Sequence, residues 1–169
     1  MRFPAFLAAS ALVATPALAA VPAPHVKAQS FEQLAKPLPL PYDENAAAKA
    51  AVDKAHARAK TSGKLLLIDL GGNWCLDCRI LAGTMELPEL KAWVARHYEL
   101  VTVDVGRFDK NLDVPAHYGI TDRLKGVPSL LVVDPKSDRL INAGNTAALS
   151  DARSMTPQGL ADYLAQWAR

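Results

Sequence analysis

The feature that most limits the fold of this chain is the apolar run Lys-Leu-Leu-Leu-Ile-Asp-Leu at positions 64–70. The run is short and continuous, and Gly71-Gly72-Asn73 ends it, which favours a β-strand buried on both faces. A strand of that kind needs helices on both sides of its sheet, so the sequence predicts an α/β fold. The 169 residues are enough for one domain with a substantial core.

The remaining patterns supply the other layers of this fold. Helices are predicted over residues 44–61, 75–81, 88–97 and 157–167, and strands over residues 64–70, 100–105, 127–133 and 139–143. Asp43 is the expected N-cap of the first helix and Gly63 its end, while Thr156 and Pro157 should begin the last helix. A polar loop is expected from Gly106 to about Val114. This order predicts a three-layer sandwich with a central mixed β-sheet flanked by helices.

Residues 1–19 have the features of a secretory signal peptide. Arg2 is the only charged residue, an apolar stretch follows it, and Ala17-Leu18-Ala19 provides the small residues that suit cleavage. The stretch is too short and interrupted for a comfortable membrane span, and an uncleaved N-terminal anchor is the alternative. We therefore expect an exported protein in an oxidising compartment, the periplasm if the source is a Gram-negative bacterium.

Residues 20–42, called the leader below, are rich in proline and have no sustained periodicity. They predict an extended segment that precedes a domain spanning residues 43–169. Four apolar side chains of the leader are candidates for docking on that domain: Phe31, Leu34, Leu38 and Leu40.

The chain has two cysteines, and both lie in Trp74-Cys75-Leu76-Asp77-Cys78. So few cysteines exclude a disulfide-dense scaffold and a four-cysteine metal site. At the start of a helix, free N–H groups and the helix dipole stabilise a thiolate at the first cysteine, and the second lies about one turn further on. Cys75 is therefore predicted to attack a client disulfide, and Cys78 to resolve the mixed disulfide by forming the redox disulfide with Cys75. This chemistry requires no metal and no organic cofactor.

These motifs resemble the thioredoxin superfamily over most of the segment from Lys64 to Arg169. The similarity rests on the Trp-Cys-x-x-Cys motif after a buried strand and on Asp69, six positions before Cys75. It rests also on Gly126-Val127-Pro128-Ser129-Leu130 at the opening of a later apolar strand. The resemblance implies the thioredoxin-like sandwich for this domain.

The resemblance also implies roles for individual residues. Asp69 would be a buried carboxyl beneath the disulfide that relays the proton of Cys78, and burial should raise its pKa. The bond before Pro128 would be cis and the backbone of Val127 would pair with bound substrate. Trp74, Val127 and Pro128 then form the expected client-docking edge.

Three departures from ordinary thioredoxins bear on the redox properties. Leu76-Asp77 stands between the cysteines where thioredoxins have Gly-Pro, and the charge of Asp77 should oppose thiolate formation unless Arg79 neutralises it. Gly71-Gly72 stands in place of the second tryptophan of thioredoxins. The connector between Cys78 and Pro128 is also longer. The Leu76-Asp77 dipeptide favours a reducing role over an oxidising one.

Asp104, in a short predicted strand, is expected to face solvent and is given no role.

Several alternatives remain open from the sequence. The cysteines could form a structural disulfide, or the chain could be a non-catalytic module that handles Cu(I) or binds a partner protein. His25, His56, His97 and His117 are scattered along the chain and are not expected to be metal ligands. As an enzyme it would need protein clients that carry disulfides or thiols and a membrane-embedded electron donor. Nucleic acid is not an expected partner, because 19 Lys and Arg against 17 Asp and Glu give a net charge of only +2.

Overall fold

The computed structural model describes residues 21–169, so the predicted signal peptide lies outside the described residues. Its centre is a four-stranded sheet in the order β2-β1-β3-β4. The strand β1 (Leu65–Gly71) runs parallel to β2 (Tyr98–Asp104) and antiparallel to β3 (Ser129–Asp134). The two-residue strand β4 (Arg139–Leu140) extends the sheet antiparallel to β3. The predicted mixed sheet is confirmed.

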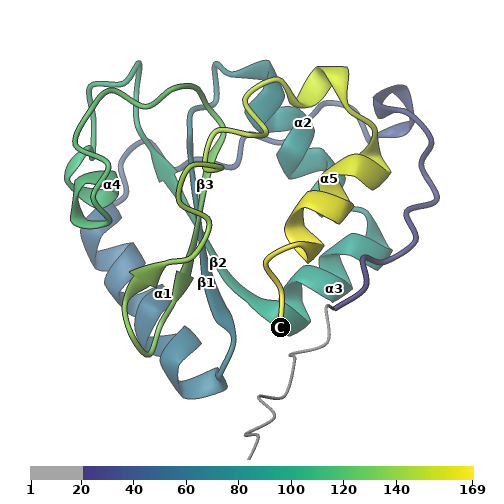
Figure 1. Cartoon of the computed structure of the whole chain (residues 1–169). Helices are drawn as coiled ribbons and strands as arrows, with labels where there is room; N and C mark the ends of the chain where they lie inside the picture. The colour runs from purple at the N-terminus through teal and green to yellow at the C-terminus, as the bar shows by residue number, and fades with distance from the viewer. Residues whose placement is uncertain (1–20) are drawn as a thin grey trace, which may run out of the picture.

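Helices cover both faces of this sheet (Figure 1). One side carries α1 (Ala48–Ser62) and α4 (Asp113–His117), and the other carries α2 (Leu76–Met85), α3 (Pro88–His97) and α5 (Pro157–Ala165). Every residue of β1 is buried, as a central strand with helices on both sides requires. The predicted three-layer α/β sandwich is confirmed.

The first helix begins later than its sequence pattern predicts. Its first residue is Ala48, and Asp43 does not cap it. The Asp43 carboxylate instead accepts the backbone N–H of Asn45 at 2.9 Å, which closes a turn ahead of the helix. Gly63 ends the helix as predicted, with a left-handed φ of 76°.

Other predicted elements occur with shifted ends. The helix after the cysteines continues to Met85 rather than stopping at 81, and β2 begins directly after α3. The loop predicted over residues 106–114 runs into the short helix α4, and the last strand is limited to two residues. Thr156 caps the last helix as predicted, accepting the Gly159 N–H at 3.0 Å, but this helix ends at Ala165.

The leader is packed against the helices rather than extended into solvent. It runs along the outer side of α3 and α5 towards α2 (Figure 1). Leu34 and Leu38 are buried, whereas Leu40 is 63% exposed, so only part of the expected docking is observed. The backbone N–H of Val26 donates to the Gln158 side chain of α5 at 2.8 Å. The leader therefore contributes to the core on this side of the sheet.

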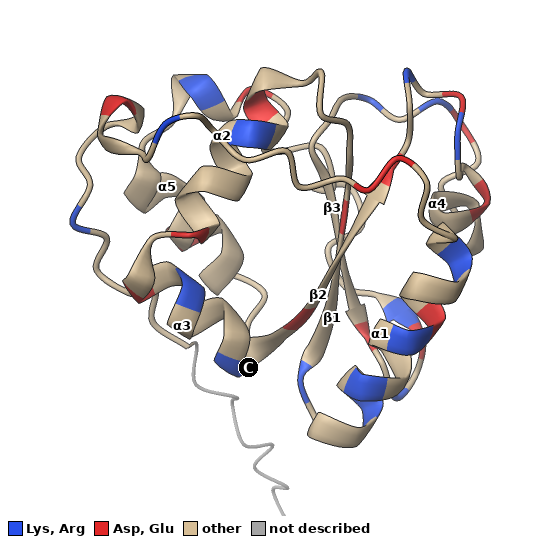
Figure 2. Ribbon diagram, turned by 180° about the vertical axis from the view of Figure 1, so that it is seen from behind, with Lys and Arg blue, Asp and Glu red and all other residues tan. Residues whose placement is uncertain are grey.

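Charged residues lie mainly on helices and loops, with acidic and basic positions interspersed (Figure 2). The central strands are uncharged apart from a few acidic positions, and Asp69 is the one within β1. No helix within residues 21–169 combines the length and the apolar character needed to cross a bilayer. Asp69 is thus the single carboxyl of β1, the central strand in which every residue is buried.

Candidate active site

A disulfide joins Cys75 and Cys78 at the N-terminus of α2, with 5.3 Å between their Cα atoms. Cys75 is the N-cap of the helix, and its Sγ accepts the backbone N–H of Cys78 at 3.1 Å. Its side of the pair is the more accessible, because Cys75 is 5% exposed and Cys78 is fully buried. This position provides the N–H groups and the helix dipole that stabilise a thiolate.

The residues of the expected docking edge lie beside this disulfide. The Val127–Pro128 bond is cis, as the thioredoxin resemblance implies, and the Val127 carbonyl oxygen is 3.4 Å from Cys75 Sγ. Trp74 is 44% exposed, and its indole N–H donates to the Gly106 carbonyl at 2.7 Å. The structure thus brings Trp74, Cys75, Val127 and Pro128 together around the more accessible sulfur.

Three side chains that the sequence did not single out extend this rim. Arg107 lies over the Trp74 ring, with its guanidinium carbon 4.6 Å from the ring centroid. Phe108 meets Trp74 edge-on at 6.2 Å between centroids, and Arg123 lies 4.5 Å over the Phe108 ring. Cation–π contacts of this kind fix the orientation of exposed rings. Their residues come from two loops whose packing no local pattern predicts.

Asp69 is fully buried in β1, as the resemblance implies. The Tyr42 hydroxyl donates to Asp69 Oδ1 at 2.9 Å, and among the described residues Oδ2 has no hydrogen-bond partner. Burial raises the pKa of Asp69 from 3.8 to about 7, and the hydrogen bond from Tyr42 opposes this rise. A carboxyl with that pKa can take up or release a proton near neutral pH.

The prediction that Arg79 neutralises Asp77 is wrong. Asp77 is 5% exposed and pairs with Arg153, whose Nε donates to Oδ1 at 3.0 Å. Burial opposes ionisation here, but the hydrogen bonds from Arg153 hold the pKa of Asp77 below its ordinary value. Arg79 turns to the leader instead and donates to the Leu38 carbonyl at 3.0 Å. Because Arg153 compensates the charge of Asp77, this charge opposes a thiolate at Cys75 less than expected.

The prediction that Asp104 faces solvent is also wrong. Asp104 is 5% exposed, accepts the Gly106 N–H at 3.1 Å and pairs with Lys110 Nζ at 3.3 Å. These contacts tie the loop after β2 to the end of that strand. Because Gly106 also accepts the indole N–H of Trp74, Asp104 supports the rim of the site from beneath.

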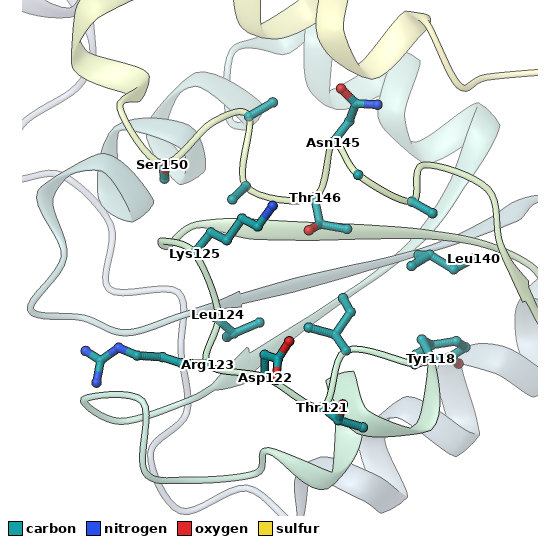
Figure 3. A pocket seen from close by; sticks show the side chains of 16 residues that line it. Tyr118, Thr121, Asp122, Arg123, Leu124, Lys125, Leu140, Asn145, Thr146 and Ser150 are labelled. Atoms are coloured by element: carbon teal, nitrogen blue, oxygen red, sulfur yellow. The ribbon is translucent and has the colours of Figure 1, made fainter.

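A pocket of about 610 Å³ lies away from the disulfide, between residues 118–125 and 143–150 (Figure 3). Neither cysteine lines it, although Lys125 at its wall precedes Val127 by two positions. Within residues 21–169, no three His, Cys, Asp or Glu side chains are grouped so as to hold a metal ion. The cysteine pair with Asp69 is therefore the strongest candidate for chemistry in the described part of the chain.

Comparisons with known proteins agree with this geometry. The model of a family described as thioredoxin-like matches residues 47–135, more than half of the chain. The chain is 30% identical over 116 residues to the thiol:disulfide interchange protein DsbD 1 of Pseudomonas aeruginosa, in a match covering 64% of this chain and 19% of that protein. It thus spans about a fifth of that relative's length.

A solved structure is similar over a larger share of its own length. The crystal structure of a disulphide isomerase from Xylella fastidiosa is 39% identical, with a TM-score of 0.68, over 76% of this chain and 96% of that one. The sheet order, the disulfide at the start of α2 and both matches lead to one assignment: the chain belongs to the thioredoxin-like family and carries a Cys-x-x-Cys redox pair.

Proposed function

We propose that this protein is an exported thiol–disulfide oxidoreductase that exchanges its Cys75–Cys78 pair with protein clients. The observation that carries the proposal is the disulfide at the N-terminus of α2, in which Cys75 is slightly exposed, at 5%, and Cys78 is fully buried. The names of the two relatives, an interchange protein and an isomerase of disulfides, support the reaction class. The signal-peptide features of residues 1–19 support export to the periplasm.

The reaction starts from the reduced pair. The Cys75 thiolate, held by the Cys78 N–H and the start of α2, attacks a client disulfide and forms a mixed disulfide. The second client sulfur leaves as a thiolate and takes a proton from solvent. Cys78 then gives its proton to Asp69 and attacks the Cys75 sulfur, which releases the first client thiolate and closes the Cys75–Cys78 disulfide. Two electrons pass from the protein to the client.

The surroundings of Cys75 orient the client for this attack. The Val127 carbonyl, 3.4 Å from the Cys75 sulfur, is placed to accept a backbone N–H from a client chain that crosses the site. Trp74, which is 44% exposed and has Arg107 over its ring, offers an aromatic surface next to it. A main-chain contact combined with one aromatic surface suits clients of varied sequence, since neither requires a particular side chain.

We propose that electrons flow from this protein to its clients, as in a reductase or isomerase. Cys75 is stabilised by the helix N-terminus and one N–H, and the nearby Asp77 is balanced by Arg153. We take this to be a moderate stabilisation of the thiolate, which favours a reducing over a strongly oxidising pair. In an oxidising compartment such a pair needs a continuing supply of electrons, for which a membrane-embedded donor is the proposed source.

The direction is tested by the reduction potential of the pair. Equilibration with glutathione buffers, followed by alkylation and mass detection, is expected to give a value near that of thioredoxin, about −270 mV. A value near about −120 mV, which is typical of a strong periplasmic oxidant, would reverse the direction and make the protein a disulfide donor.

The exchange itself is tested with Cys78→Ser. This variant keeps the attacking sulfur but cannot resolve, so mixed disulfides with exported proteins should accumulate and appear as reductant-sensitive adducts on gels. A Cys75→Ser, Cys78→Ser double variant is the matched control and should form none. If Cys78→Ser also forms no adducts, exchange with protein clients is excluded for this site.

A further inference from the structure

We propose that Tyr42, a residue of the leader, is a positioning residue of the redox site. Its hydroxyl fixes the Asp69 carboxyl and thereby adjusts the exchange of a proton between Asp69 and Cys78. The kinetic part of this inference rests on the proposed function, whereas the part concerning Asp69 does not. The leader then belongs to the active site.

The first support is the contact between the two side chains. Tyr42 is 2% exposed, and its hydroxyl donates to Asp69 Oδ1 at 2.9 Å in the interior of the protein. Among residues 21–169, Tyr42 is the one side chain that hydrogen-bonds to the Asp69 carboxyl, and no Lys, Arg or His donates to it. Two further titratable groups lie close to Tyr42. Cys78 of α2 lies against the same glycine, Gly71, and Asp104 at the end of β2 interacts electrostatically with the Tyr42 hydroxyl.

The second support is the space at Gly71. A Cβ atom built on this residue would overlap the Tyr42 hydroxyl and would lie 2.9 Å from Cys78 Sγ. The tyrosine ring and the buried sulfur therefore both lie against the same glycine at the end of β1. Any larger residue at position 71 would displace the Tyr42 ring, so the glycine leaves the space that this ring occupies.

The third support is the set of bonds that hold the leader next to Tyr42. Side chains on either side of the cysteines, together with one from β2, bind its backbone. The Asn73 side chain accepts the Tyr42 N–H at 3.1 Å and donates to the Tyr42 carbonyl at 2.8 Å. The Thr102 hydroxyl donates to the Pro41 carbonyl at 2.9 Å. The Arg79 guanidinium donates to the Pro39 carbonyl at 3.2 Å and to the Leu38 carbonyl at 3.0 Å. The position of Tyr42 is thus tied to that of the redox pair.

The expected effect follows from which form of the carboxyl the tyrosine favours. A hydroxyl that donates to a carboxylate stabilises its charged form, so Tyr42 lowers the pKa of Asp69 against the effect of burial. Removing the hydroxyl should raise the pKa of Asp69 further, and Asp69 would then accept the proton of Cys78 only at higher pH.

The test compares Tyr42→Phe with a matched control, Tyr98→Phe. Tyr98 is also 2% exposed, and its hydroxyl donates to the Leu164 backbone carbonyl at 2.7 Å. It packs in the core with α3 and α5, whereas Tyr42 packs in the core with α1. The protonation of Asp69 is followed by infrared spectroscopy of protein with isotope-labelled aspartate, and Asp69→Asn identifies the band. Tyr42→Phe should move the titration upward by about one pH unit, and Tyr98→Phe should leave it in place.

The kinetic readout is the pH dependence of mixed-disulfide resolution, whose midpoint should move by the same amount in Tyr42→Phe. Asn73→Ala removes two bonds that hold the leader but keeps the Tyr42 hydroxyl, so it should shift the Asp69 titration and this midpoint upward by a smaller amount. This variant is used for the test if Tyr42→Phe does not fold. The inference is overturned if Tyr42→Phe and Tyr98→Phe have equal melting temperatures and the Asp69 titration is unchanged in Tyr42→Phe. Tyr42 would then contribute to packing alone. A shifted titration in a protein without exchange activity would overturn the proposed function and leave the role of Tyr42 intact.

Discussion

Cys75→Ser is expected to abolish the reduction of client disulfides, with a loss of at least about 1,000-fold relative to the unaltered protein. Cys75 is the more exposed cysteine of the redox pair, and a serine hydroxyl cannot replace a thiolate as nucleophile near neutral pH. The measurement is the rate at which the reduced protein cleaves a model protein disulfide when a chemical reductant regenerates the pair.

The control for this loss separates attack from structure. Far-ultraviolet circular dichroism of Cys75→Ser should match that of the unaltered protein in its reduced form, because the hydroxyl can still accept the N–H at the start of α2. A folded Cys75→Ser protein that kept more than about a tenth of the rate would show that Cys75 is not the attacking group.

Asp69→Asn is expected to change the stability of the oxidised protein in a pH-dependent way. The pKa of Asp69 is about 7 in the fold and 3.8 as an ordinary carboxyl. Well below pH 3.8 the group is protonated in both states and contributes no pH dependence. As the pH rises from 4 to 7 the unfolded chain ionises first, so the unaltered protein loses stability, on the order of 4 kcal/mol by pH 8. An asparagine has no such titration.

Urea denaturation of both oxidised proteins at pH 4 and pH 8 measures this difference. The free energy of unfolding of the unaltered protein should fall relative to that of Asp69→Asn between the two values. Parallel changes in the two proteins would mean that Asp69 is not buried in its neutral form, which would also remove the basis for its proposed role in proton transfer.

The same substitution separates the two chemical steps. Asp69→Asn removes the group proposed to accept the proton of Cys78, so resolution of the mixed disulfide near neutral pH should slow by roughly 100-fold, while attack by Cys75 should change less than about 3-fold. Rapid-mixing experiments with a chromophoric disulfide resolve both steps. An equal slowing of attack and resolution would contradict the proton relay.

What the sequence could predict was local in the chain. The buried strand, the cysteines at the next helix N-terminus and the carboxyl six positions before them are close together in the sequence. The later strand was predicted from its own apolar pattern, and the thioredoxin resemblance added the cis bond before Pro128. The Thr156 cap and the Gly63 helix end are likewise fixed by neighbours in sequence, and the structure confirms both.

What the sequence could not predict depends on contacts between distant segments. Asp77 pairs with Arg153, 76 positions away, rather than with the nearby Arg79, because α2 packs against the short 3₁₀ helix that carries Arg153. Tyr42 is a single aromatic residue at the end of a proline-rich segment, and no periodicity distinguishes it from a solvent-exposed one. Its importance arises only when the leader crosses the end of β1.

The anchoring of the leader has a consequence for the order of folding. Val26 and Pro24 bind Gln158, which follows them by more than 130 residues, so these two contacts cannot form until the last helix exists. Contacts over such separations form late, since the intervening chain must first be ordered. A chain that emerges N-terminus first would therefore complete its sheet and its cysteine helix before Pro24 and Val26 are fixed on the last helix.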